Sequence, residues 1–328
     1  MSVAPQAEVA ANEDPRQMPL AAPSVAVVIC TNRPGALAAA VASVLANDEP
    51  PFELIVVAQG ADAGWAHEEL VAHADDPRLR IVHDPARGLS HARNVGLREA
   101  SGEIVLFTDD DCLVAKDWVA AHVACHRERP DAVLVFGTVV PPEEYTGLNG
   151  FVPVFDPGEV QPTSRLGIVL GIGANMSMRR DLFGRIGPFD EQLGAGAPLK
   201  SAEDMDLSLR VWAAGLVALA DGRPRVVHAL GMRRLGQESR ELWRRDGVGG
   251  GALLAKLLRI GQWRAAWPMI YGLGDVWWVV IANVVRGRRP FGLARIGMRT
   301  VGMLEGLALG MRQPLRRVPE GYVFTPRP

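Results

Sequence analysis

The stretch Ile104-Val105-Leu106-Phe107-Thr108-Asp109-Asp110-Asp111 is an apolar run that passes directly into three carboxylates. A short run rich in β-branched and aromatic residues is typical of a strand that is buried on both faces. Further apolar runs precede it along the chain, and segments with helical spacing separate them. We predict strands at 25–30, 53–57 and 79–82, and helices at 37–45, 65–73 and 90–99. This alternation predicts βαβ units and therefore an α/β fold with a mostly parallel sheet.

The sequence after the three carboxylates predicts the rest of the sheet. A helix and a strand at 132–136 follow within 117–140, and a Pro- and Gly-rich surface loop covers 141–165. A helix is predicted at 201–214, and two short runs at 217–220 and 225–228 extend the sheet. In such sheets, ligands bind beside the carboxyl ends of the strands. The polar turns that end the predicted strands are therefore the places to look for chemistry.

Composition excludes several classes of protein and divides the chain. The 328 residues include 48% hydrophobic residues and 3 cysteines, which excludes a disordered chain and a disulfide scaffold. Cys30, Cys112 and Cys125 lack metal-site spacing, so we interpret them as buried, reduced thiols of a cytosolic protein. Residues 1–23 contain acids and prolines without an apolar core, so they do not resemble a signal peptide, and we expect a flexible leader.

The net charge of −2 is a cancellation between two parts of the chain. From Arg233 onward there are 17 basic and 6 acidic residues, so the last 96 residues carry +11 and the first 232 carry −13. Five of the eight tryptophans also lie in this basic part. We therefore predict a catalytic domain at 24–232 and a basic helical region at 233–328, with different partners.

Two acidic clusters are candidate sites, and each has a structural alternative. Asp109, Asp110 and Asp111 follow a buried strand, so they fit a hard divalent cation that shares its ligands with a phosphate, or an acidic turn that caps a helix. Glu203 and Asp204 stand at a predicted helix start, which by itself favours ionised carboxylates. A carboxylate fixed there can also accept a proton from a nucleophilic hydroxyl. For each cluster, the spacing alone leaves both the functional and the structural interpretation open.

Taken in order, several motifs resemble the family 2 glycosyltransferases, which have the GT-A fold. The resemblance runs from about Val25 to His228. The residues that carry it are Val28-Ile29-Cys30-Thr31-Asn32-Arg33-Pro34, Gly88-Leu89-Ser90-His91-Ala92-Arg93-Asn94-Val95-Gly96, Ser101 to Asp111, Gly173-Ala174-Asn175-Met176-Ser177-Met178-Arg179, Gly187-Pro188-Phe189-Asp190-Glu191 and Ala202-Glu203-Asp204-Met205-Asp206-Leu207.

The resemblance implies a metal-dependent transfer of a sugar from a nucleotide-sugar donor. Asp109 and Asp111 resemble the two ends of the family's DxD motif, the first near the ribose and the second on Mn²⁺ or Mg²⁺, and Asp110 shares in either role. The cation would assist departure of the nucleoside diphosphate. Asp204 resembles the general base of an inverting single displacement, and Glu203 would bind the acceptor or orient Asp204.

The same resemblance assigns further binding residues. Thr31 and Arg33 are similar to positions that hold the nucleotide, and Arg93 and Asn94 to the segment beneath it. His228 resembles an additional metal or diphosphate ligand. For Arg93 the alternative is a charge on a helix surface, and for His228 it is a structural histidine.

Two departures from the family pattern bear on substrate. Ala58 stands where the family usually has an Asp that grips the base, so we expect the amide of the neighbouring Gln59 to replace it. The QxxRW motif of processive relatives is broken, because Arg240 is followed by Glu241. Transfer of a single sugar is therefore expected, rather than synthesis of a polymer.

The segment 269–285 predicts an amphipathic helix within the basic region. It is close to the minimum length of a membrane span, but it contains Asp275 and is followed by Arg286, so we expect it to lie in the membrane interface rather than to cross it. The alternative is that its apolar face packs on the catalytic domain or on a second subunit. We expect 291–311 to be its partner helix.

These interpretations predict a peripheral enzyme at the cytoplasmic face of the cell membrane. Its partners would be a nucleotide-sugar donor, a glycan or lipid-linked acceptor and an anionic membrane surface, with no nucleic acid. The rival hypotheses are a nucleotidyltransferase on a related fold, which would need a basic triphosphate loop, and a catalytically silent membrane adaptor.

Overall fold

The structure is a computed structural model that describes residues 23–145, 150–158, 168–229, 233–234, 237–286 and 293–327. The side chains of 150–151, 233–234, 271–276, 279–280 and 282–284 fall outside this description. Residues 1–22 of the predicted leader and parts of the predicted loop 141–165 also lie outside the described residues.

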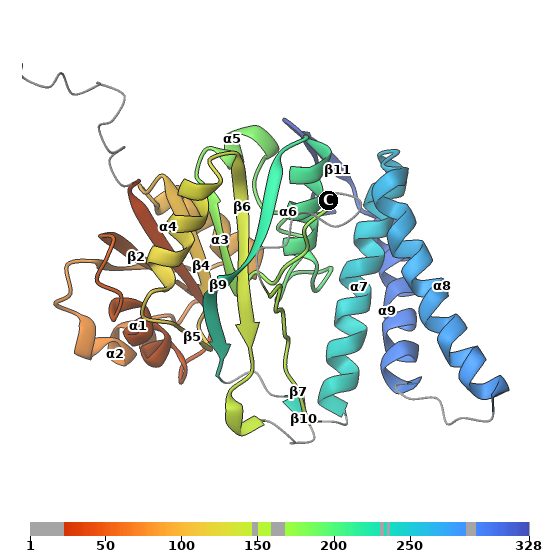
Figure 1. Ribbon diagram of the computed structural model, residues 1–328, viewed down its shortest axis with the longest axis horizontal. Helices are drawn as coiled ribbons and strands as arrows, with labels where there is room; N and C mark the ends of the chain where they lie inside the picture. The colour runs from red at the N-terminus through yellow and green to blue at the C-terminus, as the bar shows by residue number, and fades with distance from the viewer. Residues whose placement is uncertain are drawn as a thin grey trace, which may run out of the picture.

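An eight-stranded sheet forms the centre of the part of the chain before α7 (Figure 1). Its strands, in spatial order, are β3 (Leu79–Asp84), β2 (Phe52–Gln59), β1 (Val25–Thr31), β4 (Ile104–Asp109), β8 (Asn175–Arg179), β6 (Ala132–Val140), β9 (Val217–His228) and β5 (Cys112–Val114). Strand β1 pairs in parallel with β2 and β4, whereas β8 is antiparallel to both β4 and β6. The predicted α/β fold with a mostly parallel sheet is confirmed.

Successive residues of the central strands face opposite sides of the sheet, and both sets are apolar. Helices therefore cover both faces. One core joins Val27 and Ile29 of β1 to α1 (Leu37–Leu45) and α4 (Trp118–Glu128). The other joins Ala26 and Val28 to the helices on the opposite face, which are α3 (Leu89–Glu99), α5 (Leu182–Ile186) and α6 (Glu203–Ala213). Three short helices complete this part of the chain: α2 (Trp65–Glu69), η2 (Val71–His73) and η3 (Glu143–Tyr145).

Strand register brings the predicted polar turns to one edge of the sheet. Cys30 of β1 lies opposite Asp109 of β4, and Thr31 lies opposite Ala58 of β2. The parallel strands therefore end together, and the residues that follow them meet at the carboxyl edge where ligands bind in open α/β sheets.

Three long helices and a hairpin follow the sheet. They are α7 (Gln237–Arg259), α8 (Trp263–Val285), α9 (Leu293–Arg312), β11 (Leu315–Val318) and β12 (Gly321–Phe324). A short strand pair, β7 (Gly150–Phe151) with β10 (Arg233–Arg234), precedes them. The helices stand side by side at one end of the molecule (Figure 1). Among the described residues, no helix has both the length and the apolar character needed to cross a membrane.

Helix α9 packs mainly on α7, and glycines make this contact possible. A Cβ added at Gly306 of α9 would lie 1.9 Å from the carbonyl oxygen of Val248, and one at Gly251 of α7 would lie 2.0 Å from that of Met303. The helix predicted at 291–311 therefore forms over its described residues, but its principal partner is α7. Its polar contact with α8 is the hydrogen bond that Trp277 Nε1 donates to Thr300 Oγ1, at 3.0 Å.

Candidate functional site

A cavity of about 360 Å³ opens at the carboxyl edge of β1, β2 and β4. Seven of the predicted residues line it: Thr31, Arg33, Gln59, Asp109, Asp110, Asp111 and His228. Leu242 and Arg245 of α7 contribute to another part of the wall. The cavity therefore joins the ends of the central strands to a helix of the basic region.

Each aspartate of the triplet has a different environment. Asp110 Oδ2 accepts a 2.7 Å hydrogen bond from Thr31 Oγ1, and Asp111 Oδ2 accepts one of 2.8 Å from Arg33 Nη2. Burial raises the pKa of Asp110 to about 6, although the Thr31 hydrogen bond and Arg33 oppose the shift. Burial also raises the pKa of Asp109, opposed by Arg93. The triplet is thus a compact acidic site with two arginines as counter-ions.

Asp111 and His228 together fit a divalent cation. Ligand atoms of Asp111, Cys112 and His228 lie within 4.8 Å of one another, and His228 Nε2 is 3.8 Å from Asp111 Oδ1. The other ring nitrogen of His228 is buried and has no hydrogen-bond partner among the described residues. Burial raises the pKa of the Cys112 thiol, and a soft sulfur suits Mn²⁺ less well than oxygen and nitrogen donors do. The oxygen and nitrogen donors that remain suit Mn²⁺ or a similar ion.

Arg93 connects the aspartate triplet to the second acidic cluster. Its guanidinium donates to Glu203 Oε1 at 3.0 Å and to Asp109 Oδ1 at 3.4 Å, and the side chain is only 2% exposed. A Cβ on Gly173 would lie 2.6 Å from Arg93 Nη2, so glycine leaves the space that this buried arginine occupies. Arg93 is therefore a buried link between β4 and α6, and the alternative of a surface charge is wrong.

Asp204 is held firmly at the first turn of α6. Its two carboxylate oxygens accept hydrogen bonds from the backbone N–H groups of Met205, at 2.7 Å, and Gly173, at 3.1 Å. Burial raises the pKa of Asp204, while Arg93 and these two N–H groups oppose the rise. Ala202, just before the helix, has the left-handed φ of 74°, which is a strained conformation for a residue other than glycine. A fixed carboxylate with a raised pKa has the properties required of a general base.

Two predicted binding residues use their amides to shape the protein itself. Asn94 does not line the cavity, because its Nδ2 donates to Phe189 O and its Oδ1 accepts from Phe189 N, at 3.0 and 2.9 Å. Gln59 does line the cavity, but its Nε2 donates to Ala86 O at 2.9 Å and its Oε1 accepts from Gly88 N at 3.3 Å. The structure thus places Gln59 at the site and Asn94 behind it.

Sequence reasoning missed the contribution of α7. Nothing in the local pattern distinguishes Arg245 from the other arginines of the basic region. For this region the sequence predicts contact with an anionic membrane surface. Its place in the cavity depends on the packing of α7 beside α6, which no short motif encodes.

Comparison with known proteins finds a family model that matches part of the chain. The family described as "Glycosyl transferase family 2" matches residues 25–187. The chain carries a glycosyltransferase family 2 domain. This match spans β1 to β8 and includes the whole aspartate triplet, so the resemblance predicted from the motifs is confirmed.

Individual relatives agree with this assignment. The chain is 31% identical over 208 residues to the glucosyl-dolichyl phosphate glucuronosyltransferase of Haloferax volcanii, covering 57% of this chain and 63% of that protein. It is 36% identical over 83 residues to the uncharacterized glycosyltransferase YfnE of Bacillus subtilis, covering 25% of this chain and 21% of that protein. The chain thus spans less than two thirds of these curated relatives.

Solved structures confirm the fold. The mannosyltransferase PcManGT from Pyrobaculum calidifontis, in complex with GDP-Man and Mn²⁺, aligns with a TM-score of 0.60 at 18% identity, over 89% of this chain and 91% of that one. GalNAc-T7 with UDP, GalNAc and Mn²⁺ aligns with a TM-score of 0.50 at 19% identity, over 70% of this chain and 48% of that one. The predicted GT-A fold is therefore confirmed.

Proposed function

We propose that this protein is a metal-dependent, inverting glycosyltransferase that moves one sugar from a nucleotide-sugar donor to a hydroxyl of a lipid-linked glycan. The observation that carries the proposal is the Arg93 bridge, because it joins Asp109 of the aspartate triplet to Glu203, the neighbour of Asp204, in one site. A leaving group and a general base must stand on opposite sides of the same anomeric carbon, and this arrangement supplies both.

On the donor side, Asp111 and His228 would hold the cation, which would neutralise charge on the departing nucleoside diphosphate. Thr31 and Arg33 line the same part of the cavity and are placed to contact the nucleotide. Arg33 pairs with Asp110 and Asp111, so it would exchange these carboxylates for the diphosphate when the donor and cation bind. Gln59 lies at the wall, where it supports the loop that precedes α3.

On the acceptor side, Asp204 would remove the proton from the attacking hydroxyl. Its pKa, raised by burial, favours proton transfer near neutral pH more than an ordinary carboxylate would. Glu203 is engaged by Arg93 and would orient the acceptor beside Asp204. Direct attack from the face opposite the diphosphate inverts the anomeric configuration.

We also propose that the enzyme works as a peripheral protein on the anionic cytoplasmic face of the cell membrane. The archaeal relative is named for a dolichyl phosphate substrate, which supports a lipid-linked acceptor. Six large apolar side chains of α8 are between 38% and 80% exposed: Trp263, Trp267, Ile270, Trp278, Ile281 and Val285. At 100° per residue, these six fall within about 80° of the helix circumference.

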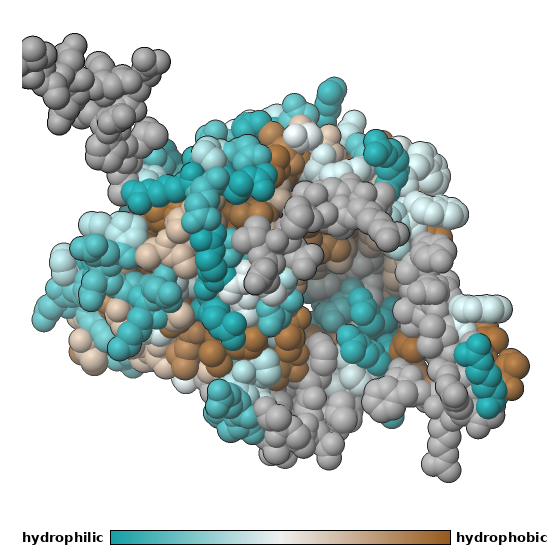
Figure 2. Space-filling view, viewed as in Figure 1, coloured by the Kyte–Doolittle hydropathy of each residue, from teal (hydrophilic) through white to brown (hydrophobic). Residues whose placement is uncertain are grey.

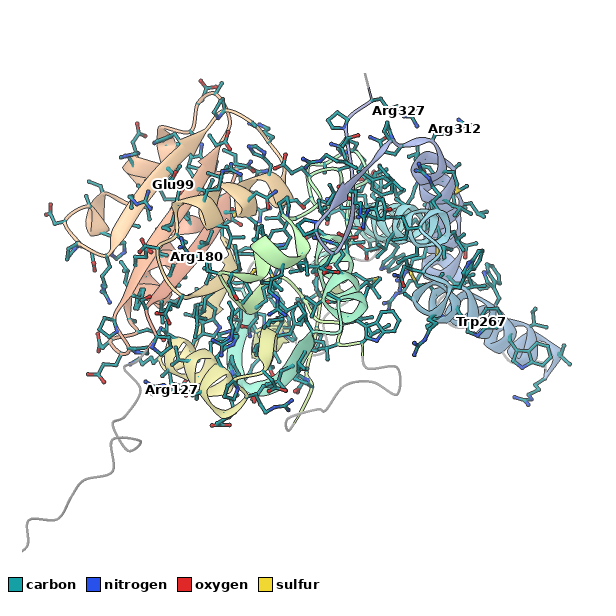
Figure 3. All side chains as sticks on the ribbon, turned by 90° about the horizontal axis from the view of Figure 1, so that it is seen from above. Glu99, Arg127, Arg180, Trp267, Arg312 and Arg327 are labelled. Carbon is teal, nitrogen blue, oxygen red and sulfur yellow. The ribbon has the colours of Figure 1, made fainter. Side chains whose placement is uncertain are left out.

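The position of this apolar stripe supports membrane contact. Figure 3 places Trp267 at the end of the molecule opposite Glu99 and Arg180, and Figure 2 shows hydrophobic atoms exposed where Figure 1 draws the end of α8. Arg264 and Arg286, both exposed, flank the stripe. An apolar stripe with tryptophans and flanking arginines is typical of a helix that lies among anionic head groups. Asp275, the acidic residue that argues in sequence against a membrane span at 269–285, has a side chain outside the described residues.

The two rival hypotheses have less support. A nucleotidyltransferase would need a basic triphosphate-binding loop beside the first strand, whereas Arg33 is the only basic residue between Val25 and Ala36. A silent adaptor would not need Asp204 to be held by two backbone N–H groups beside a buried arginine.

Substitution of Asp204 tests the proposed chemistry. A panel of nucleotide sugars with Mn²⁺ first identifies the donor by its slow hydrolysis. Asp204→Asn should then reduce transfer by about 10²–10⁴-fold, because a general base contributes on that scale. Its affinity for the nucleoside diphosphate should stay close to that of the wild type.

The matched control is Asp75→Asn, which removes an exposed carboxylate from the turn before β3, at the opposite edge of the sheet. Chelation of divalent cations should stop transfer by the wild type and the control alike. Normal transfer by Asp204→Asn would show that the base assignment is wrong. Absence of turnover with every donor, even after addition of membrane lipid extract, would favour the adaptor.

A further inference from the structure

Helix α7 forms a wall of the reaction cavity, and Arg245 is the cation that it contributes. Arg245 lines the cavity and is exposed. Within the described part of the chain, its guanidinium makes no hydrogen bond or ion pair. Arg33, the other arginine of the cavity wall, is by contrast paired with Asp110 and Asp111. Arg245 is therefore available to a ligand without first releasing a carboxylate.

Backbone contacts place the first turns of α7, which carry Arg245, beside the segment that leads into the proposed general base. Ser201 Oγ donates to the carbonyl oxygen of Arg245 at 3.1 Å, and Ser201 lies three residues before Asp204. A Cβ on Gly249 of α7 would lie 2.2 Å from Ser201 Oγ, so the two segments approach as closely as their atoms allow. The metal-binding residues Asp111 and His228 come instead from the ends of β4 and β9, on the donor side.

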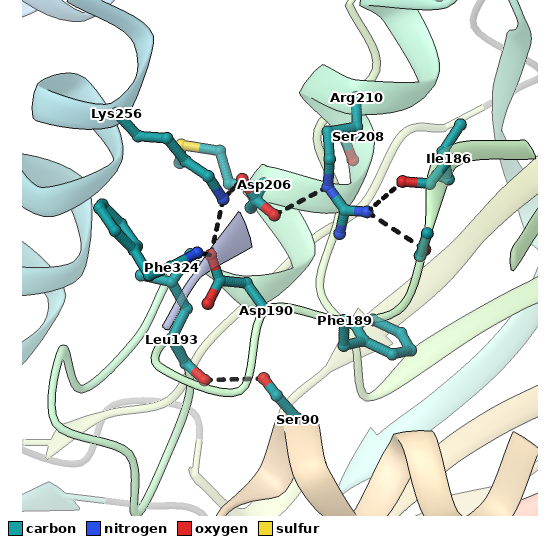
Figure 4. A network of polar contacts seen from close by, with 12 residues as sticks. Ser90, Ile186, Phe189, Asp190, Leu193, Asp206, Ser208, Arg210, Lys256 and Phe324 are labelled. Atoms are coloured by element: carbon teal, nitrogen blue, oxygen red, sulfur yellow. Dashed lines mark hydrogen bonds and ion pairs between the residues drawn. The ribbon is translucent and has the colours of Figure 1, made fainter. Parts of the chain in front are cut away.

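A buried charge network fixes α7 in this position (Figure 4). Lys256 Nζ donates to Asp190 Oδ2 at 2.7 Å and to Asp206 Oδ1 at 2.6 Å, and all three side chains are almost fully buried. Arg210 Nε completes the network with a 2.9 Å bond to Asp206 Oδ2. Asp206 belongs to the same helix as Asp204, so Lys256 holds the helix that carries Arg245 against the helix that carries the base.

We infer that Arg245 binds an oxyanion of the acceptor, namely a phosphate group attached to the sugar or lipid that carries the attacking hydroxyl. A guanidinium presents two parallel N–H groups that match two phosphate oxygens. The donor diphosphate already has counter-ions on its own side, in Arg33 and the cation held by Asp111 and His228. This inference rests on the proposed function, because it gives the substrate class of the acceptor site.

Binding of a small phosphate amphiphile tests the inference without turnover. The probes are octyl phosphate and uncharged octyl glucoside, each titrated calorimetrically into the full-length protein below the micellar concentration. Arg245→Ala should weaken octyl phosphate binding at least about tenfold, the loss expected for one charge-assisted contact. It should leave octyl glucoside binding unchanged, and Arg245→Lys should recover part of the affinity.

Arg244→Ala is the matched control. Arg244 is the preceding residue of α7, and it pairs with Glu305 of α9 at 2.7 Å rather than lining the cavity. This variant should bind octyl phosphate as the wild type does. The control also detects any binding of the amphiphile to the basic surface in general.

Two results would overturn the inference. Equal octyl phosphate affinities of Arg245→Ala and the wild type would exclude a phosphate-binding role. Weakened binding of UDP with Mn²⁺, at unchanged octyl phosphate affinity, would assign Arg245 to the donor diphosphate. Failure of the proposed function is recognised separately, because it appears as absence of nucleotide-sugar hydrolysis by the wild type, whereas the titrations decide the role of Arg245 in either case.

Discussion

Two buried histidines of α4 share a chain of hydrogen bonds with Asn175 and Ser177. Asn175 Nδ2 donates to two backbone carbonyls, so its Oδ1 accepts from His122 Nε2 at 2.9 Å. The other nitrogen of His122 lies 2.8 Å from Ser177 Oγ, which is also 3.0 Å from His126 Nε2. Burial lowers the pKa of His122 to about 3 and that of His126 to about 4.

These lowered pKa values predict a loss of stability in mild acid. The unfolded chain takes up protons below pH 6.5, the ordinary value, whereas the folded chain resists protonation of His126 until about pH 4. The histidine contribution to the free energy of unfolding is therefore complete above 6.5 and is lost as the pH falls from 6.5 toward 4. Asp110, whose pKa is raised to about 6, contributes in the opposite sense over part of this range.

The difference in pH dependence between the wild type and His126→Gln isolates the contribution of His126 to the free energy of unfolding. Between pH 6.5 and 5.5, the wild type should lose about 1 kcal/mol more unfolding free energy than His126→Gln, which cannot titrate. Urea unfolding at the two pH values, without divalent cations, measures both. Parallel pH dependences would show that His126 titrates normally in the folded protein.

Single residues also mark where sequence reasoning stops. The triplet, His228 and Thr31 could be predicted to share a site, because each directly follows or ends a recognisable strand. The ion pair between Arg93 and Glu203 could not be predicted, because the two residues lie 110 positions apart in sequence. The hydrogen bonds of Asn94 could not be predicted for the same reason, because its partner Phe189 lies 95 residues away in sequence.

At the scale of elements, the contact between α7 and α9 depends on the absence of side chains. Gly306→Ala should lower the free energy of unfolding by about 1–3 kcal/mol, because its Cβ would lie 1.9 Å from the Val248 carbonyl oxygen, and backbone atoms cannot easily give way. Denaturant unfolding, monitored by tryptophan fluorescence and circular dichroism, measures the change.

Gly297→Ala is the control on the same helix. A Cβ there meets nothing within 4 Å, so the substitution should stabilise the protein by about 0.5–1 kcal/mol through helix propensity. If both substitutions had the same effect, close packing of α7 and α9 would not contribute to stability.

The helices and strands were easier to predict from the sequence than the elements that they pack against. Hydrophobic patterns predicted the central strands and the helix over 291–311, because burial on one or two faces leaves a local trace. The runs at 217–220 and 225–228, predicted separately, form the single strand β9. The pairing of α9 with α7 rather than α8 left no such trace, because glycines in a helix look unfavourable until their partner is known.

At the scale of the whole molecule, the +11 region does more than present an exposed basic surface. Arg264 and Arg286 flank the exposed stripe of α8, whereas Arg245 lines the cavity and Lys256 is buried against Asp190 and Asp206. Deleting 233–328 would therefore leave Asp190 without Lys256 as its counter-ion, leave Asp206 with Arg210 alone, and expose the apolar residues packed between α6 and α7. A test of membrane binding needs point substitutions instead.

Replacement of three tryptophans should release the protein from membranes. Trp263, Trp267 and Trp278 are each more than 60% exposed, so changing all three to Ser leaves the core intact. Co-sedimentation with vesicles that contain phosphatidylserine should fall at least about tenfold relative to the wild type. Binding by the wild type should weaken in high salt and with neutral vesicles.

The control for this experiment changes exposed apolar residues elsewhere. Val71→Ser with Val154→Ser alters side chains that are 72% and 56% exposed on the catalytic body. This double variant should sediment as the wild type does. Equal sedimentation of the triple tryptophan variant would instead indicate that the α8 stripe faces another protein or a second copy of this chain.

The Arg93 bridge makes the two acidic clusters thermodynamically inseparable. One buried guanidinium serves both Asp109 and Glu203, so neutralising either carboxylate leaves more of its charge for the other. Free-energy changes measured for substitutions at these two positions will consequently not add, and each single variant will report on donor and acceptor together. The contributions of Asp109 and Glu203 are properties of the pair, and only a double-mutant cycle can apportion them.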